Sequence, residues 1–222
     1  METLINFFKT VLEFIPEFIP GVITTLQLAF LSILFGTILG LFIALLKLTN
    51  NKIIIGLANA YITLVRGTPL LLQLWFIFYG LPSMGIRIDT FPSAILGLSL
   101  HNAAYISEIF RGAIESIDSG QNEAARSLGM TQLQCLRRVV LPQAFRRSIP
   151  SLGNQFIIAI KDSSLASVIT ITETMLTAKQ LVSATFNVFP IFFIAAAFYL
   201  IMTTVVARLL TGLEDKLRVE TD

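Results

Sequence analysis

Two long stretches without a charged residue constrain the fold of this chain more than any other feature. The first runs from Phe18 to Leu46 over 29 residues, and the second runs from Gln180 to Ala207 over 28 residues. A helix needs about 20 apolar residues to cross the hydrocarbon core of a bilayer. Only 14% of the 222 residues are charged, against about 25% in soluble domains. The chain is therefore predicted to be all-α and polytopic in the membrane.

Three further spans are predicted between these two runs. One is broken or kinked by the charge and the proline in RGTP, Arg66 to Pro69. Another starts with 12 apolar residues, about 18 Å of helix, so it must carry Lys161 and Asp162 into the membrane. Pro16 and Pro20 are expected to prevent a continuous helix into the first span. The five predicted spans form one transmembrane domain over residues 1–222: Phe18–Leu46, Ile53–Leu81, Phe91–Ser107, the span from Ile149 through Asp162, and Gln180–Ala207.

The lysine and arginine residues of the loops predict the orientation. The loop after the second span holds only Arg87, whereas six arginines follow the third span: Arg111, Arg126, Arg137, Arg138, Arg146 and Arg147. Cytosolic loops carry the excess of such residues. The N-terminus is therefore expected outside and the C-terminus, with Lys216 and Arg218, in the cytosol. The chain opens without a positive segment, so no cleaved signal peptide is expected.

Residues 118–142 are neither apolar enough for lipid nor loose enough for a linker, and they predict two short cytosolic helices. Asp118 or Ser119 caps the first helix, and Gly129 ends it in a left-handed conformation. Thr131 and Gln134 form a capping-box pattern that opens the second helix, and Pro142 is expected to end it. Ala124, Ala125 and Leu128 share one helical face. An amphipathic connector on the membrane surface and a docking element for a partner both fit this pattern.

Ionisable and polar residues also fall near the predicted midplane. At helical rise, Arg66 and Lys161 lie roughly 21 and 16 Å from the inner surface, and His101 and Asn102 lie roughly 15 Å from the outer one. Such groups face the bundle interior or a cavity and mark candidate functional sites. His101, Tyr105 and Glu108 share one helical face, with Asn102 at its edge.

A helix break is predicted at Asp162, Ser163 and Ser164, with a new helix N-terminus directly after it. Free N–H groups at such an end attract a carboxylate. Asp162 or Glu108 could hold an ammonium group, so the charges together suit an amino acid. The alternative is that Arg66, Glu108, Lys161 and Asp162 pair with one another and hold the bundle together.

Several function classes are excluded by composition. The net charge of +2 gives no basis for nucleic-acid binding. The single cysteine, Cys135, excludes an internal disulfide and a cysteine metal cluster, and no metal site is expected. The chain has no GxxxxGK[ST] phosphate loop, so it is not expected to hydrolyse ATP by that route.

The motifs in register resemble the permease subunits of binding-protein-dependent ABC importers, in the polar amino-acid branch. Their signature begins with EAA, here at Glu123, and has a glycine after three further residues, here Gly129. After nine more residues the family has isoleucine, where this chain has Val139, and after one more residue the signature ends with Leu141-Pro142. The family also commonly has KDTSL where this chain has KDSSL at Lys161 to Leu165. Further matching stretches are RGTPLLLQLWF from Arg66, AYISEIFRGAIESI from Ala104 and LPQAFRRSIP from Leu141.

The resemblance implies the type I ABC importer permease fold, with five transmembrane helices and a cytosolic coupling helix in a bacterial inner membrane. Its implied partners are a cytosolic ATPase dimer, which binds ATP and Mg²⁺, a second permease subunit and an extracytoplasmic amino-acid-binding protein. Residues 118–142, named the coupling loop from here on, would dock on the ATPase through Glu123, Ala124, Ala125 and Gly129. The candidate substrate-binding residues are Arg66, Asn102, Tyr105, Glu108, Lys161, Asp162, Ser163 and Ser164.

Two other function classes remain as alternatives. An ion-coupled secondary transporter could use Glu108 and Asp162 for ion coupling, and a membrane scaffold would transport nothing. Neither explains the signature of the coupling loop. The sequence identifies neither the amino acid nor whether the chain pairs with itself or with a similar subunit.

Overall fold

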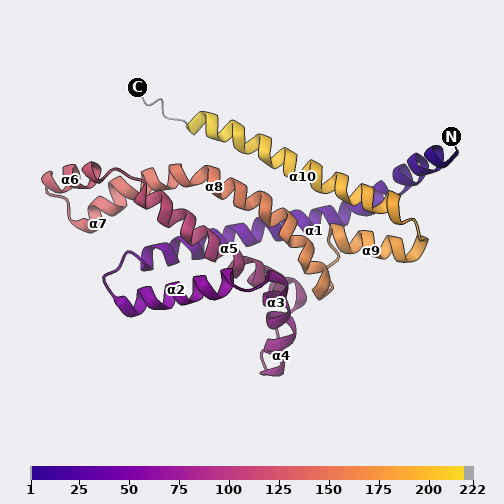
Figure 1. Cartoon of the computed structure of the whole chain (residues 1–222), viewed down its shortest axis with the longest axis horizontal. Helices are drawn as coiled ribbons and strands as arrows, with labels where there is room; N and C mark the ends of the chain where they lie inside the picture. Colours follow the sequence, from indigo (N-terminus) through magenta and orange to yellow (C-terminus); the bar gives the residue numbers. More distant parts are fainter. Residues whose placement is uncertain (1, 218–222) are drawn as a thin grey trace.

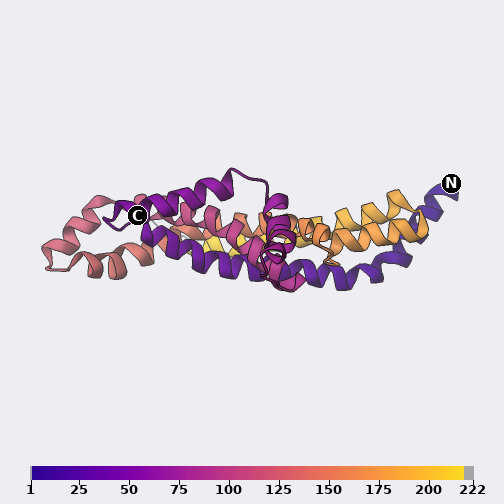
Figure 2. The same cartoon turned by 90° about the horizontal axis from the view of Figure 1, so that it is seen from below.

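The computed structural model describes residues 2–217, which form helices and their connections without a strand (Figure 1). Two π-helical segments, Phe76–Gly80 and Leu136–Val140, and one 3-10 helix, Ser163–Ile169, lie between α-helices. The α-helices are α1 (Glu2–Leu46), α2 (Lys52–Arg66), α3 (Leu70–Trp75), α4 (Leu81–Ser83), α5 (Thr90–Glu115), α6 (Ser119–Ser127), α7 (Gln132–Cys135), α8 (Leu141–Asp162), α9 (Thr174–Thr185) and α10 (Val188–Leu217). Helix α6 and α7 lie at the end of the elongated molecule opposite the N-terminus in both views (Figures 1 and 2).

Helix α1 runs the length of the bundle and is continuous through Pro16 and Pro20. The expectation that these prolines prevent a continuous helix was wrong. A proline removes one backbone hydrogen bond, but its fixed φ is close to the helical value. Phe18, between the two prolines, is fully buried in a cluster with Ala178 and Ile191, and this packing holds the local turn.

Helix α5 packs closely along α1 because two glycines leave room for it. A Cβ atom on Gly36 would lie 2.9 Å from the Cβ of Asn102, and one on Gly40 would lie 2.8 Å from the Cγ2 of Ile106. Small residues four positions apart allow such an approach between membrane helices. The close approach brings the polar residues of α5 next to α1 and fixes the frame of the candidate site.

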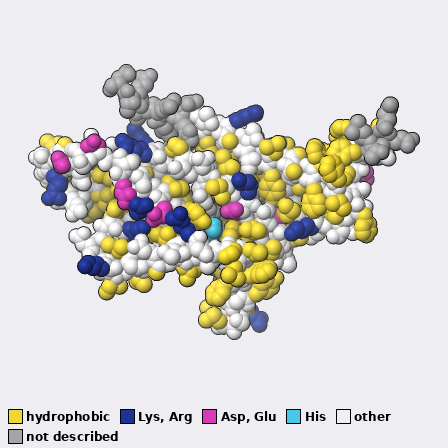
Figure 3. All heavy atoms as spheres, viewed as in Figure 1, with side chains coloured by type: hydrophobic (Ala, Val, Ile, Leu, Met, Phe, Trp, Pro, Cys, Tyr) yellow, Lys and Arg dark blue, Asp and Glu magenta, His cyan; other side chains and the backbone are white. Residues whose placement is uncertain are grey.

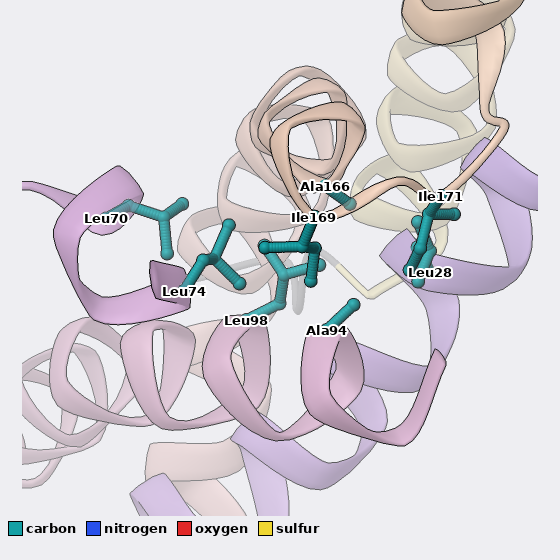
Figure 4. Close-up of a cluster of buried hydrophobic side chains, with 8 residues drawn as sticks. All are labelled: Leu28, Leu70, Leu74, Ala94, Leu98, Ala166, Ile169 and Ile171. Carbon is teal, nitrogen blue, oxygen red and sulfur yellow. The ribbon is translucent and has the colours of Figure 1, made fainter. Parts of the chain in front are cut away.

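The second span is broken, as the RGTP stretch predicted. The two halves, α2 and the segment from α3 to α4, meet at an angle of 105°. Leu70 and Leu74 of α3 fill a core against α5, the 3-10 helix and α1 (Figure 4). The corner therefore has a packed, buried inner side, which places Arg66 at the bend. The buried residues of this core are Leu28, Leu70, Leu74, Ala94, Leu98, Ala166, Ile169 and Ile171.

Pro82 and Pro142 lie inside helical segments, and each directly follows a π-helical segment and one further residue. The prediction that Pro142 ends the second helix of the coupling loop was wrong. The chain continues from the π turn at Leu136–Val140 into α8. The N–H of Leu141 bonds to the oxygen of Leu136, five residues back, and the N–H of Leu81 before Pro82 bonds to that of Phe76 in the same way. The wider turn moves the preceding carbonyls away from the proline ring, which would clash with them in an α-helix.

The last predicted span also differs from the structure. Its uncharged run, residues 180–207, is divided at Phe186, which has a φ of 60° and ends α9 before α10 begins. Among the described residues, α1 and α10 alone are long and apolar enough to span a membrane, and two bent pairs raise the number to four. Helix α5, which carries polar residues of the candidate site, is not among these four. The count of five spans therefore stays a prediction.

Candidate functional site

The coupling loop folds from local capping interactions. The Asp118 carboxylate accepts from the N–H of Gly120 at 2.7 Å and caps α6, and Thr131 and Gln134 form the predicted capping box that opens α7. At the end of α6, Gly129 has a φ of 81° and its N–H donates to Arg126 O at 2.9 Å. The N–H of Met130 donates to Ala125 O at 3.2 Å, which completes a Schellman motif. The sharp turn at Gly129 was predicted and is confirmed.

The candidate docking residues divide between the inside and the outside of the coupling loop. Ala125 is 4% exposed and packs with Cys135 and Val140 in a small core. Glu123 and Ala124 are exposed on α6. Of the three residues predicted to share one face, Ala124 and Leu128 are exposed, Leu128 by 80%, whereas Ala125 is in the small core. The surface offered to a partner thus carries an acidic, a small and a large apolar residue.

A groove of about 670 Å³ lies between the coupling loop and the connection from α1 to α2. Leu48 and Asn50 line one side, and Asn122, Leu133 and Leu136 line the other. Arg147 of α8 donates to the backbone oxygen of Ser116, so the base of the loop is tied to the end of α5. The loop is therefore a folded unit attached to two long helices rather than a loose connection.

Two of the predicted polar residues of the membrane region, Arg66 and His101, lie next to the ring of a third, Tyr105. The Arg66 guanidinium carbon is 5.3 Å from the ring centroid of Tyr105, a cation–π geometry. The His101 ring lies 5.0 Å from the same ring. Figure 3 shows this face, where a row of basic and acidic side chains leads to the cyan histidine near the middle of the molecule.

Glu108 is engaged by two cations of the same chain. Its carboxylate lies 2.7 Å from the Lys47 Nζ and 2.9 Å from an Arg111 nitrogen. Among the described residues, Arg66 and Lys161 make no ion pair, so the four predicted charges do not pair with one another. The alternative of a mutually paired bundle of Arg66, Glu108, Lys161 and Asp162 is therefore wrong; Lys47, at the end of α1, is the partner that the pattern did not indicate.

Two of the candidate residues are enclosed between helices. Asn102 is 1% exposed; its amide nitrogen donates to the Ser32 hydroxyl at 3.3 Å, and its oxygen accepts from Gln155 at 2.9 Å. These bonds join α5 to α1 and α8. Ser163 is fully buried, and its hydroxyl donates to Ile160 O at 2.8 Å. Their role in substrate binding stays a prediction.

The helix N-terminus expected at Asp162, Ser163 and Ser164 is not there. The N–H of Ser163 bonds back to Ala159 O, and the chain continues directly from α8 into the 3-10 helix. Lys161 is exposed, and Asp162 and Ser164 are half-buried at this junction. The free N–H groups of a half-helix are therefore absent from this position. The positive charge at the junction of α8 and the 3-10 helix comes from Lys161.

The next helix begins ten residues later, at a residue that sequence reasoning missed. Glu173 caps α9 and is fully buried. Its carboxylate accepts from the N–H groups of Met175 and Leu176 at 2.8 and 2.9 Å, and from the Tyr199 hydroxyl at 2.7 Å. The signal was present, since Glu173 lies between threonines directly before an apolar helix. Gln73, the single polar residue in the apolar run from Leu70 to Phe78, was missed as well.

Comparison with known proteins agrees with this architecture. The nopaline transport system permease protein NocM of Agrobacterium fabrum is 42% identical over 211 residues, which cover 90% of this chain and 88% of that protein. The glutamine transport system permease protein GlnP of Escherichia coli is 37% identical, and the match covers 92% of this chain and 94% of that protein. Both matches run over nearly the whole of this chain and over most of each relative.

Solved structures give the same result. A chain in the crystal structure of an amino acid ABC transporter with histidines superposes with a TM-score of 0.89 at 42% identity, over 94% of this chain and 98% of that one. The inward-facing MetNI methionine ABC transporter has the same fold, with a TM-score of 0.77 at 20% identity, over 91% of this chain and 96% of that one. The all-α fold class of type I importer permeases is thereby confirmed.

The family model for the binding-protein-dependent transport system inner membrane component matches residues 36–219. This range contains the coupling loop and every candidate residue of the membrane region. The resemblance stated from the motifs is confirmed, and the chain belongs to the family of inner membrane components of binding-protein-dependent transport systems.

Proposed function

We propose that this chain is the membrane-spanning subunit of an ATP-driven amino-acid importer. It would lie in a bacterial inner membrane with its N-terminus outside and its C-terminus in the cytosol. The observation that carries the proposal is the folded coupling loop, which offers Glu123, Ala124 and Leu128 at the end of the molecule opposite the N-terminus. Family membership and the names of the amino-acid transport relatives support it over an ion-coupled secondary transporter or a scaffold.

The proposed mechanism separates the chemical step from the movement of substrate. ATP and Mg²⁺ bind to a separate ATPase dimer, because this chain lacks a phosphate loop. Closure of that dimer moves the coupling loop, and the ties from α8 to α5 pass the movement into the bundle. A second permease subunit, identical or similar, completes the pathway, and an extracytoplasmic binding protein delivers the amino acid.

The charges of the predicted substrate-binding residues suit a zwitterion. Arg66 and Lys161 are exposed and unpaired among the described residues, so either can attract a carboxylate. Asp162 and Ser164 lie half-buried beside Lys161 and offer oxygens to an ammonium group. Glu108 is neutralised by Lys47 and Arg111, so its role is to hold α1 against α5 unless these partners move.

Reconstitution tests the proposal directly. The chain is co-expressed with its ATPase and binding protein, and uptake into proteoliposomes is measured for radiolabelled L-glutamine, L-arginine, L-histidine and L-cystine. We expect uptake of at least one of them to require ATP on the ATPase side and to persist when ionophores collapse the ion gradients. Uptake that follows an ion gradient without ATP would establish the secondary transporter instead.

Removal of the Asp162 carboxylate is expected to weaken transport. Asp162→Ala deletes an acceptor for the substrate amine, and a hydrogen bond to a charged group contributes about 1.5–3 kcal/mol, so the KM of uptake should rise by about tenfold or more. Asp89→Ala, which removes an exposed carboxylate that makes no capping hydrogen bond, is a control that should leave KM unchanged. Uptake kinetics of Asp162→Ala that match the wild type would assign Asp162 a structural role only.

A further inference from the structure

One amide side chain closes the corner where the second span breaks. The Nε2 of Gln73 on α3 donates to the backbone oxygens of Val65 and Thr68, at 2.8 and 3.1 Å, and contacts the Thr68 hydroxyl at 3.0 Å. One of these carbonyls lies in the last turn of α2 and the other lies just past the end of the helix, where helical partners run out. Since an amide oxygen would repel two carbonyl oxygens, the orientation of the amide is fixed, and its Oε1 points away from the corner.

This oxygen determines which nitrogen of His101 carries the proton. The Nδ1 of His101 lies 3.1 Å from the Gln73 Oε1. The amide oxygen can only accept, so Nδ1 must be the donor. A second proton on the ring would add a charge to a side chain that is 9% exposed and shares the Tyr105 ring with the Arg66 guanidinium. The neutral ring is therefore favoured, with a lone pair on Nε2.

The Nε2 atom of His101 has no hydrogen-bond partner among the residues whose side chains are described, 5–213, but it is not enclosed. The Ser99 hydroxyl is the one buried side-chain nitrogen or oxygen atom without a partner in the part of the chain whose side chains are described. The ring also reaches the molecular surface at the end of the row of charges (Figure 3). An oriented acceptor and the Arg66 guanidinium thus both lie next to the Tyr105 ring. The carboxylate of Glu108 is occupied by Lys47 and Arg111.

We propose that His101 is a substrate-binding residue whose Nε2 accepts a hydrogen bond from the protonated amine of the transported amino acid. Gln73 is the positioning residue that fixes the tautomer, and Arg66, on the same Tyr105 ring, attracts the carboxylate. The inference rests on the proposed function and adds to it a second acceptor for the amine, besides Asp162. It also explains why a polar amide and a histidine occupy an otherwise apolar corner.

Two substitutions of His101 separate the two ring nitrogens. His101→Asn places an N–H donor where Nδ1 stands and keeps the bond to Gln73, but it removes the acceptor. His101→Gln places an amide oxygen near the position of Nε2 but loses the bond to Gln73. Ser99→Ala, on the same helix and facing away from this corner towards α1, is the matched control. The complete complex is used, with the labelled amino acid that the wild type transports best.

The expected results are different for the two variants. For His101→Asn, the KM of uptake should rise by about tenfold or more, because a hydrogen bond to a charged group is lost, with the maximal rate and the melting temperature near those of the wild type. For His101→Gln, KM should stay within about threefold of the wild type while the melting temperature falls. Ser99→Ala should leave KM unchanged, and it should not lower the melting temperature, because it removes a buried hydroxyl that has no partner.

Two outcomes overturn the inference while the proposed function stands. One is an unchanged KM for His101→Asn. The other is a loss of uptake in both variants that follows the loss of folded complex, which would make His101 a packing residue. If the wild-type complex itself shows no ATP-dependent uptake of any amino acid tested, the proposed function fails first, and this inference fails with it.

Discussion

Gly129→Asp is expected to abolish amino-acid uptake while the protein still inserts and folds. The φ of Gly129 is 81°, and a residue with a side chain in this conformation costs about 1–2 kcal/mol. Apart from its two chain neighbours, no described residue has a heavy atom within 4 Å of the position of a Cβ atom there, so the fold has room for the side chain. A larger effect must come from the partner surface, where a loss of about 1.4 kcal/mol in docking weakens the complex about tenfold.

A matched control exists at the other positive-φ glycine. Gly85 has a φ of 86° and equally open surroundings, and it lies after α4, far along the chain from the coupling loop. Gly85→Asp should carry the same backbone cost yet leave co-purification of the ATPase intact. Glu123→Lys, which reverses an exposed charge on α6, should also abolish uptake. If Gly129→Asp and Glu123→Lys retain both the ATPase and uptake, the coupling role of these residues is wrong.

Glu173→Ala is expected to destabilise the protein more than any substitution of an exposed carboxylate. The change leaves two N–H groups at the start of α9 and the Tyr199 hydroxyl without their acceptor. Each buried donor without a partner costs about 1–3 kcal/mol, so the total loss should be on the order of 3 kcal/mol or more. The melting temperature of the purified protein, measured by the fluorescence of a thiol-reactive dye or by aggregation, checks this.

Two further variants make the Glu173 result specific. Tyr199→Phe removes one donor and keeps the cap, so it should produce a smaller loss of stability than Glu173→Ala. Glu115→Ala removes an exposed carboxylate paired with Arg111, and such surface pairs contribute only about 0–1 kcal/mol. Equal melting temperatures for Glu173→Ala and Glu115→Ala would show that the contacts of Glu173 do not hold α9 to α1 and α10.

The coupling loop was predictable from the sequence because its structure depends on local interactions. The cap at Asp118, the left-handed Gly129 and the capping box from Thr131 to Gln134 each involve residues within four positions of one another. The same holds for the break at RGTP. Local rules failed at Pro16 and Pro142, where tertiary packing and a π turn kept the helices continuous.

The candidate site was predictable in its residue types but less so in its pairings. Arg66 and His101 both contact the Tyr105 ring, because the second span breaks after α2, where the sequence predicted it. The pairing of Glu108 with Lys47 could not be derived, since Lys47 lies 61 positions away, just past the predicted end of the first span. Likewise, the helix N-terminus expected after Asp162 forms at Glu173. The Glu173 carboxylate accepts a hydrogen bond from the Tyr199 hydroxyl of α10, which no local pattern indicates.

The side of the membrane on which the coupling loop lies tests the account most directly. The buried Cys135 is replaced by serine, and a single cysteine is placed at the exposed position of Glu123. In intact cells, a thiol reagent that cannot cross the membrane should leave this cysteine unlabelled, and permeabilisation should expose it unless the ATPase covers it. Labelling from outside intact cells would place the loop on the wrong side for an ATPase and contradict the account.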